Sequence, residues 1–250
     1  MSKAAGRGLQ RYDRQMLIEG FGREGQERLR RAKVVVAGAG GLGCVISIYL
    51  AAAGVGKIRL VDHDRVEFTD LNRQILYTDK DVGRRKVDSA KERLESLNPE
   101  VTVEAVDQTI TEDSVLELVG GYDLIVDAMD NFAARYILNK AAIDNDIPLF
   151  HGAIHGFEGR ATTIIPGRTA CLRCLYRRVP SLGTTPVIGV AAAVIGSIQA
   201  TEVIKYIVGI GELLTNRLLI YDGLGLECME LELKRHPDCE ECRHIREAQR

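Results

Sequence analysis

The chain has 250 residues, of which 46% are hydrophobic, enough to bury a substantial core in one α/β unit. Its 33 Lys and Arg against 35 Asp and Glu give a formal net charge of −2, and only 5% of its residues are aromatic. These values argue against nucleic-acid binding, which needs clustered cations and stacking side chains.

The N-terminal region predicts a protein that stays in the cytoplasm. MSKAAGRGLQ lacks the apolar stretch of a signal peptide, and residues 9–33 have the pattern of a helical arm ahead of the first strand. The most apolar long segment begins at Val187 and contains Gln199, Glu202 and Lys205. Such polar residues do not suit a membrane span, so we expect a buried helix and no membrane partner.

Strands and helices alternate along the first half of the chain. Strands are expected at 34–37, 57–62, 101–107 and 123–127, and helices at 42–53, 84–97, 111–119 and 131–144. This alternation predicts a parallel sheet with right-handed crossovers. After residue 148, strands near 149–164, a long helix and strands at 217–222 and 227–234 predict an antiparallel extension.

The expected fold is therefore α/β and Rossmann-like. It has a mostly parallel sheet, an antiparallel C-terminal extension and an N-terminal helical arm. We expect one domain over residues 1–250, with a nucleotide-binding half at 32–150 and a second half at 151–250.

A glycine-rich turn lies in VVVAGAGGLGCVISIYL at 34–50. In a strand–turn–helix setting, Gly38 permits the sharp turn, Gly40 lets a phosphate approach the backbone, and Gly43 lets helix and strand pack closely. Asp62 closes the next strand, where a carboxylate can accept hydrogen bonds from ribose hydroxyls. The turn predicts a nucleotide site without naming the nucleotide, and an NAD-dependent oxidoreductase is one alternative.

Charged and polar residues after this turn favour a triphosphate. Four of them follow the ribose-binding position: Asp64, Arg73, Gln74 and Lys86. Arg73 or Lys86 alone could form a surface ion pair, but two cations placed together suit the several phosphates of a nucleotide. Asp127 and Asp130 follow at the end of a later strand, where ligands of open α/β folds bind. Asp130 is the expected Mg²⁺ ligand, with a helix N-cap as its alternative role.

Two Cys-x-x-Cys pairs predict a metal site, formed by Cys171, Cys174, Cys239 and Cys242. In a reduced compartment, paired thiolates usually meet around tetrahedral Zn²⁺. Four sulfur ligands close the site, so the zinc would be structural. A redox pair or free thiols are the alternatives. Cys44 and Cys228 are expected to be small core residues.

Taken together, these motifs resemble the MoeB/ThiF/HesA family, relatives of ubiquitin-activating enzymes. The resemblance covers RYDRQ at 11–15, GAGGLG at 38–43, VDHD at 61–64, NRQ at 72–74, Lys86, DAMDN at 127–131 and both cysteine pairs. It implies binding of Mg-ATP and adenylation of the C-terminal glycine carboxylate of a ubiquitin-like sulfur carrier protein, with release of pyrophosphate. The activated carrier would serve molybdopterin, thiamin or related biosynthesis.

The resemblance also implies residue roles. Asp62 would bind the ribose, Asp130 the Mg²⁺, and Arg14 would reach across a homodimer into the partner's site. The implied catalytic residues are Arg14, Arg73, Lys86 and Asp130; the implied nucleotide ligands are Gly38, Gly40, Gly41, Gly43, Asp62, Asp64, Arg73, Gln74, Lys86 and Asn131. A separate sulfur donor and a carrier-binding half at 151–250 are expected.

Two points stay open at this stage. The chemistry also suits adenylation of another carboxylate, in a peptide or a modified tRNA base, although the low positive charge argues against tRNA. The family commonly has Asn where this chain has Asp70, in TDLNRQ. A carboxylate near a triphosphate is repelled unless a cation is close, so Asp70 is not counted among the site residues.

Overall fold

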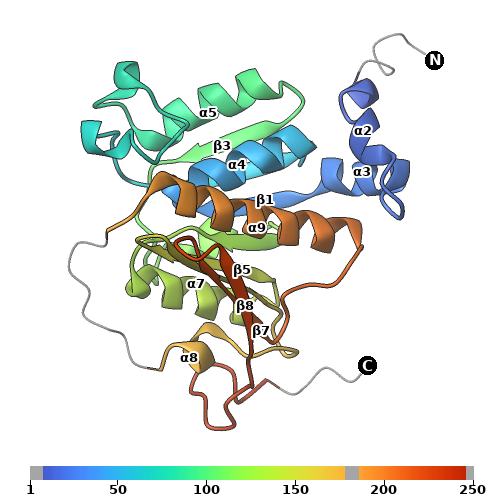
Figure 1. Cartoon of the computed structure of the whole chain (residues 1–250), viewed down its shortest axis with the longest axis vertical. Coiled ribbons are helices and arrows are strands. Elements are labelled where there is room, and N and C mark those ends of the chain that lie inside the picture. The colour runs from blue at the N-terminus through green and yellow to red at the C-terminus, as the bar shows by residue number, and fades with distance from the viewer. Residues whose placement is uncertain (1–7, 178–185, 246–250) are drawn as a thin grey trace.

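The computed structural model describes residues 8–177 and 186–245. Within these residues, eight strands form one sheet in the order β3-β2-β1-β4-β5-β6-β7-β8 (Figure 1). The parallel strands are β1 (Lys33–Ala37), β2 (Lys57–Val61), β3 (Thr102–Val106), β4 (Leu124–Asp127) and β5 (Leu149–His155). The antiparallel strands are β6 (Glu158–Ile164), β7 (Arg217–Asp222) and β8 (Glu227–Glu232). The predicted Rossmann-like sheet with its antiparallel extension is confirmed.

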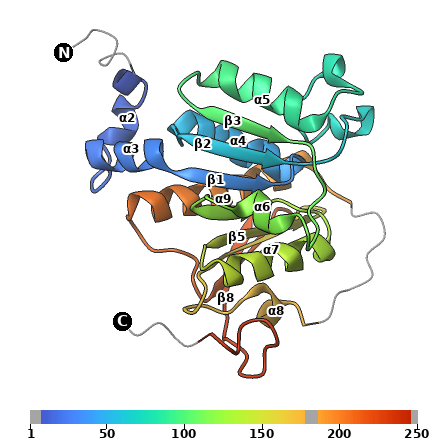
Figure 2. The same ribbon diagram turned by 180° about the vertical axis from the view of Figure 1, so that it is seen from behind.

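Helices cover both faces of the parallel part of the sheet. On one face lie α4 (Gly41–Ala53), α5 (Lys86–Leu97) and α9 (Gly189–Val208); on the other lie α6 (Val115–Val119) and α7 (Phe132–Asp144) (Figures 1 and 2). Val34 and Val36 of β1 pack in one core and Val35 in the other, as the two-residue period of a strand requires. Burial on both faces explains the unbroken apolar run of β1.

Helix α9 is long and apolar enough, by length and composition, to cross a membrane, with a mean hydropathy of 1.3 over its most apolar window. It packs instead on α4 and on strands β5 and β6, and the side chains of Gln199 and Glu202 are buried. The Gln199 amide donates to the main-chain oxygens of Asp127 (2.8 Å) and Phe150 (3.0 Å). Because α9 packs inside the fold and the Gln199 amide nitrogen finds its partners there, α9 is the buried core helix that the sequence predicts.

The N-terminal arm contains α2 (Asp13–Met16) and α3 (Gly22–Arg31), and α3 leads directly into β1. The Tyr12 hydroxyl accepts a 2.8 Å hydrogen bond from Asn98, and the Gln15 amide donates to the Ala53 carbonyl at 2.9 Å. These bonds fix the arm at the C-terminal end of α4. The glycine turn lies at the opposite end of that helix.

Two sequence expectations are wrong. The helix expected at 111–119 begins only at Val115, because Thr111 and Ser114 hydrogen-bond each other and hold the chain in a turn before it. Cys228 is not a core residue: it lies in β8, whose six residues are all exposed. Strand β8 ends the sheet, and it pairs with β7 alone within the described chain.

Candidate active site

The glycine turn has the geometry that its sequence predicts. Gly38 has φ +103°, and a Cβ atom there would lie 2.7 Å from the Ala128 carbonyl oxygen; a Cβ on Gly43 would lie 1.9 Å from the Gly38 carbonyl oxygen. Only glycine fits these two positions. A Cβ on Gly40 would meet no described atom closer than the Gln74 amide nitrogen at 3.9 Å. The turn is therefore open at Gly40, at the N-terminal end of α4, where free N–H groups attract anions.

Asp62 lies at the rim of this turn, directly after β2. One of its carboxylate oxygens accepts from the Ala39 amide at 2.7 Å, and the other accepts from the Asp64 amide at 2.8 Å. These bonds fix the carboxylate while leaving lone pairs free for hydroxyl donors. The position suits the ribose contact that we expect of Asp62.

Lys86 is the buried cation of the site, with 6% of its surface exposed. Its Nζ lies 3.1 Å from an Asp64 oxygen and 3.5 Å from an Asp70 oxygen. Burial alone would lower the pKa of Lys86, but the attraction of Asp62, Asp64 and Asp70 outweighs it and raises the pKa. Lys86 therefore stays charged at neutral pH, as a phosphate ligand must.

Asp70, which the sequence does not predict as a site residue, contacts several of these residues. It ends the short helix η1 (Phe68–Asp70), and its buried Oδ1 accepts from Gln74 at 2.7 Å and from Arg73 at 3.2 Å. Lys86 lies close to the other oxygen of Asp70. This buried carboxylate is therefore paired with two cations, Arg73 and Lys86. The spacing of Asp70, Arg73 and Gln74 at one helical turn is the sequence signal for this contact.

The Asp130 loop lies beside the glycine turn because β4 pairs with β1. Asp130 is exposed, and its Oδ1 accepts a 3.2 Å hydrogen bond from the Asn131 amide. The Asn131 side-chain oxygen accepts from the Ala134 amide at 2.9 Å and caps α7. The N-cap role weighed for Asp130 thus belongs to Asn131, which leaves the Asp130 carboxylate directed to solvent.

Arg14 is not brought to this cluster. It is exposed on α2, in the arm anchored at the far end of α4. A 13-residue helix is about 20 Å long, and the glycine turn lies at its other end. In Figure 1 the arm is on the right, and the segment around η1 is on the left. Arg14 therefore does not reach the site of its own chain.

The cysteines of the two Cys-x-x-Cys motifs meet in one cluster beside the short helix α8 (Leu172–Leu175). Their four sulfur atoms lie within 4.8 Å of one another. Cys171 and Cys239 are 3.6 Å apart, as are Cys174 and Cys242. Tetrahedral zinc with bonds of about 2.3 Å sets sulfur atoms about 3.8 Å apart, so the cluster fits the ion. The hydrogen bond between the two sulfur atoms lowers the pKa of Cys174 and raises that of Cys171, so the negative charge of this pair lies on Cys174.

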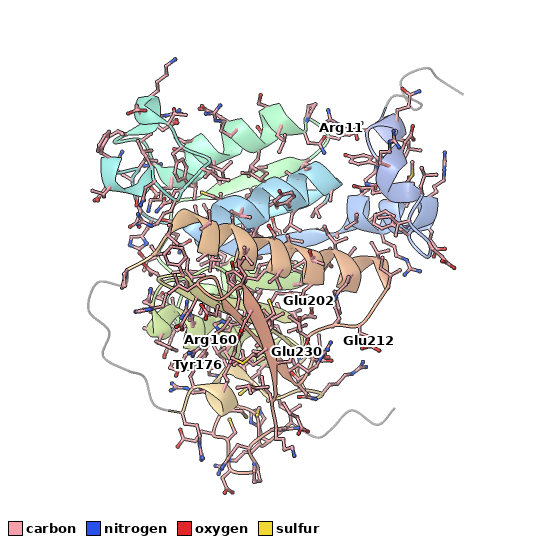
Figure 3. All side chains as sticks on the ribbon, viewed as in Figure 1. Arg11, Arg160, Tyr176, Glu202, Glu212 and Glu230 are labelled. Atoms are coloured by element: carbon pink, nitrogen blue, oxygen red, sulfur yellow. The ribbon has the colours of Figure 1, made fainter. Side chains whose placement is uncertain are left out.

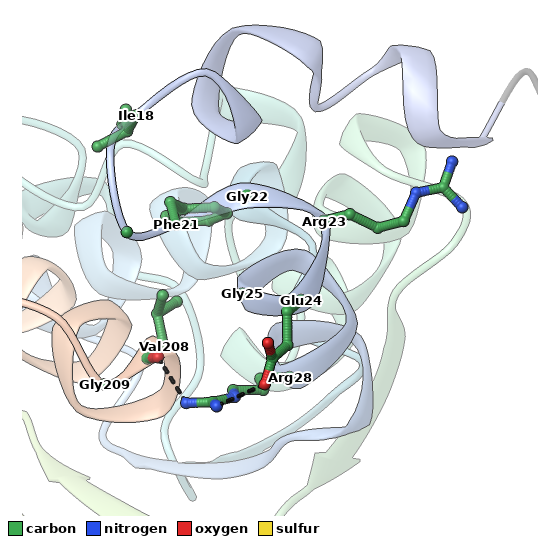
Figure 4. Close-up of a pocket in the computed structure, with 10 residues that line it drawn as sticks. Ile18, Phe21, Gly22, Arg23, Glu24, Gly25, Arg28, Val208 and Gly209 are labelled. Carbon is green, nitrogen blue, oxygen red and sulfur yellow. Dashed lines mark hydrogen bonds and ion pairs between the residues drawn. The ribbon is translucent and has the colours of Figure 1, made fainter.

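A separate hollow of about 430 Å³ lies between the N-terminal arm and the C-terminal end of α9 (Figure 4). Arg28 lines it, donating to the Val208 carbonyl at 2.8 Å and pairing with Glu24 at 2.7 Å. A cation at the C-terminus of a helix stabilises its last carbonyls, so these contacts have a structural explanation. None of the predicted site residues lines this hollow.

The sheet order and the glycine turn, with charged side chains gathered beside it, are typical of nucleotide-binding proteins of the α/β class. The model of the ThiF family matches residues 12–241. The chain belongs to the ThiF family and is an adenylyltransferase, which confirms the resemblance seen in its motifs. The alternative of an NAD-dependent oxidoreductase is not favoured.

Two of its relatives match over most of their own length. The chain is 46% identical to the sulfur carrier protein adenylyltransferase of Thermus thermophilus, over 94% of this chain and 90% of that protein. It is 45% identical to the SAMP-activating enzyme E1 of Haloferax volcanii, over 94% of this chain and 88% of that protein. Among solved structures, E. coli MccB with ATP has a TM-score of 0.81 and 27% identity, over 88% of this chain and 68% of that one.

Proposed function

We propose that this enzyme uses Mg-ATP to adenylate the C-terminal glycine carboxylate of a ubiquitin-like sulfur carrier protein and releases pyrophosphate. The names of two relatives, a sulfur carrier protein adenylyltransferase and a SAMP-activating enzyme, support this substrate class. A separate sulfur donor would then attack the acyl-adenylate, in molybdopterin, thiamin or related biosynthesis.

The main obstacle to this reaction is electrostatic. A carboxylate is a weak nucleophile, and the α-phosphate that it attacks is surrounded by negative charge. The enzyme must neutralise that charge and hold the carboxylate and the leaving pyrophosphate in line. A general base is not needed, because a C-terminal carboxyl is already ionised at neutral pH.

The residues around the glycine turn fit these tasks. We assign phosphate binding to Arg73, Gln74 and Lys86, together with the N-terminus of α4, and ribose binding to Asp62. The observation on which the proposal mainly rests is the buried Lys86, kept charged by three carboxylates.

Two metal ions complete the proposal. The exposed Asp130 carboxylate, oriented by Asn131, would hold Mg²⁺, which supplies positive charge for phosphate oxygens. The four cysteines would hold structural Zn²⁺. Because thiols in such a cluster must stay reduced, we place the enzyme in the cytoplasm.

We further propose a homodimer in which Arg14 completes the partner's site, since the arm cannot reach the site of its own chain. Residues 1–250 would act as one adenylating unit, with the nucleotide bound by the 32–150 half and the carrier by the 151–250 half.

The test is carrier-dependent exchange of pyrophosphate into ATP, combined with intact-mass analysis of the carrier. Candidate carriers ending in Gly-Gly are incubated with enzyme and Mg-ATP, and the same carriers lacking the last glycine are the matched control. We expect exchange, and a carrier that gains one adenylyl group, only with the intact C-terminus. Adenylation of a peptide or of tRNA, with no carrier modified, would overturn the proposed substrate.

A further inference from the structure

We infer that His151 and Arg135 are positioning residues for Asp130, which they hold in place through the buried carboxylate of Asp127. The inference rests on the proposed role of Asp130 as a magnesium ligand. It concerns Asp127, Arg135 and His151, which lie beside the Asp130 loop and are not among the residues to which we assign nucleotide binding.

Asp127 and His151 form a fully buried pair. The parallel register of β4 and β5 sets them side by side, and both side chains have 0% of their surface exposed. His151 Nδ1 lies 2.7 Å from Asp127 Oδ2, and Arg135 Nε lies 3.7 Å from the same oxygen. A buried carboxylate is costly unless it is paired and hydrogen-bonded, and these two groups meet that need.

The other Asp127 oxygen holds the loop that leads to Asp130. Asp127 Oδ1 accepts from the Met129 amide at 3.0 Å, and Arg135 Nη2 donates to the Met129 carbonyl at 2.6 Å. Both polar groups of the Met129 main chain are thereby fixed. The Met129 carbonyl shares a planar peptide unit with the Asp130 nitrogen, so the direction in which the chain enters Asp130 is fixed too.

The protonation of His151 follows from its neighbours. A carboxylate only accepts hydrogen bonds, so Nδ1 carries the proton and donates to Asp127. Nε2 then accepts from the Tyr176 hydroxyl, 3.3 Å away. Burial lowers the pKa of His151, against the opposing effect of Asp127, and the ring is neutral at neutral pH. Tyr176 follows α8 and lies beside Arg160 of β6 (Figure 3). These contacts thus link the end of α8, the helix that contains Cys174, to the Asp130 loop.

The experiment uses two variants that weaken the positioning contacts, one conservative variant that should restore them, and one control variant of a buried carboxylate elsewhere in the fold. His151→Leu removes the donor to Asp127. Arg135→Lys keeps a cation but cannot hold both Asp127 and the Met129 carbonyl. His151→Asn places an amide nitrogen near the position of Nδ1 and should rescue. The control is Glu202→Gln, because Glu202 is also buried and accepts from Thr163 and the Leu214 amide, away from the site.

The first readout is hydrogen exchange of the nucleotide-free protein, which needs neither activity nor metal. We expect the hydrogen-bonded amides of Ala128 and Met129 to exchange about ten-fold faster or more in His151→Leu and Arg135→Lys, and close to the wild-type rate in His151→Asn and Glu202→Gln. If His151→Leu does not fold, Arg135→Lys alone decides. Unchanged protection of these amides, or equal loss in Glu202→Gln, would overturn the inference.

The second readout is the free Mg²⁺ concentration that gives half-maximal exchange of pyrophosphate into ATP. It should rise about ten-fold in His151→Leu and Arg135→Lys, with a smaller change in the KM for ATP at saturating Mg²⁺. A wild-type Mg²⁺ requirement in both variants would refute the positioning role. Absence of exchange in the wild type would refute the proposed function instead, while hydrogen exchange would still decide the role of His151.

Discussion

Asp70 Oδ1 lies 2.7 Å from the Gln74 amide nitrogen, so a buried carboxylate holds a residue that we assign to phosphate binding. The same carboxylate bonds Arg73 and faces Lys86. Most of its negative charge is therefore balanced within the protein. A bound triphosphate must still compete with Asp70 for these three donors.

Replacing Asp70 by Asn should therefore strengthen nucleotide binding. Asp70→Asn keeps an acceptor for Gln74 and removes the charge, and we expect the KM for ATP to fall about five-fold, or about 1 kcal/mol, at low ionic strength. High salt should reduce the difference. The control is Asp81→Asn, since Asp81 ends the similar short helix η2 (Asp79–Asp81) but bonds Thr78 and Arg84. If the KM for ATP is unchanged in Asp70→Asn, or falls equally in Asp81→Asn, the charge of Asp70 does not weaken nucleotide binding.

Asp130→Ala should nearly abolish carrier-dependent exchange and leave the fold intact. The side chain is exposed, and among the described residues it bonds only Asn131, so its removal costs little stability. Activity and thermal unfolding measured on the same sample separate the two effects. Exchange at a rate near that of the wild type would show that Asp130 is not the Mg²⁺ ligand.

The cysteine cluster should hold about one zinc ion per chain, measured by elemental analysis. Chelation, or Cys174→Ser, should lower the unfolding temperature by about 10 °C or more, because structural zinc contributes several kcal/mol. Cys228→Ser is the matched control, since Cys228 is an exposed thiol outside the cluster. Metal-free protein of equal stability would indicate free thiols.

Mixing two inactive proteins should restore activity if Arg14 acts across a dimer. In each mixed dimer of Arg14→Ala with Asp130→Ala, one site keeps both residues, so random pairing gives about a quarter of wild-type activity. Arg11→Ala is the control within the same arm and should stay active, because Arg11 bonds the Leu97 carbonyl of its own chain at 3.1 Å. No recovery despite proven subunit exchange would exclude the role of Arg14 in the partner's site.

The reaction should stop at the acyl-adenylate without a covalent bond between enzyme and carrier. Residues 175–227 contain no cysteine, and burial raises the pKa of Cys44 to about 12, which leaves it un-ionised at neutral pH. We expect a Cys44→Ala, Cys228→Ala double variant to adenylate its carrier, and non-reducing gels of the wild type to show no thiol-sensitive adduct. An adduct mapped to either cysteine would contradict this outcome.

Local patterns in the sequence predict the strands and the glycine turn, because each depends on spacing within a short segment, and the cysteine cluster is predicted from two such short pairs that lie far apart in the chain. The positioning group behind Asp130 could not be predicted in this way. Asp127, Arg135 and His151 belong to three successive elements, and only the register of β4 and β5 brings them together. The role of Asp70 was only partly visible in the sequence: Arg73 lies one helical turn away, but Lys86, the second cation beside the carboxylate, lies in a later helix.

Strand β8 has a consequence for the behaviour of the protein at high concentration. It ends the sheet with all six residues exposed, and such an edge invites a second copy to add its own strand. Glu227, Glu230 and Glu232 place charged side chains on both faces of this edge, where Glu230 pairs with Arg217 at 3.0 Å and Glu232 with Lys234 at 3.3 Å. Charged side chains along an edge strand oppose the addition of a second strand, which protects the chain from aggregation through β8.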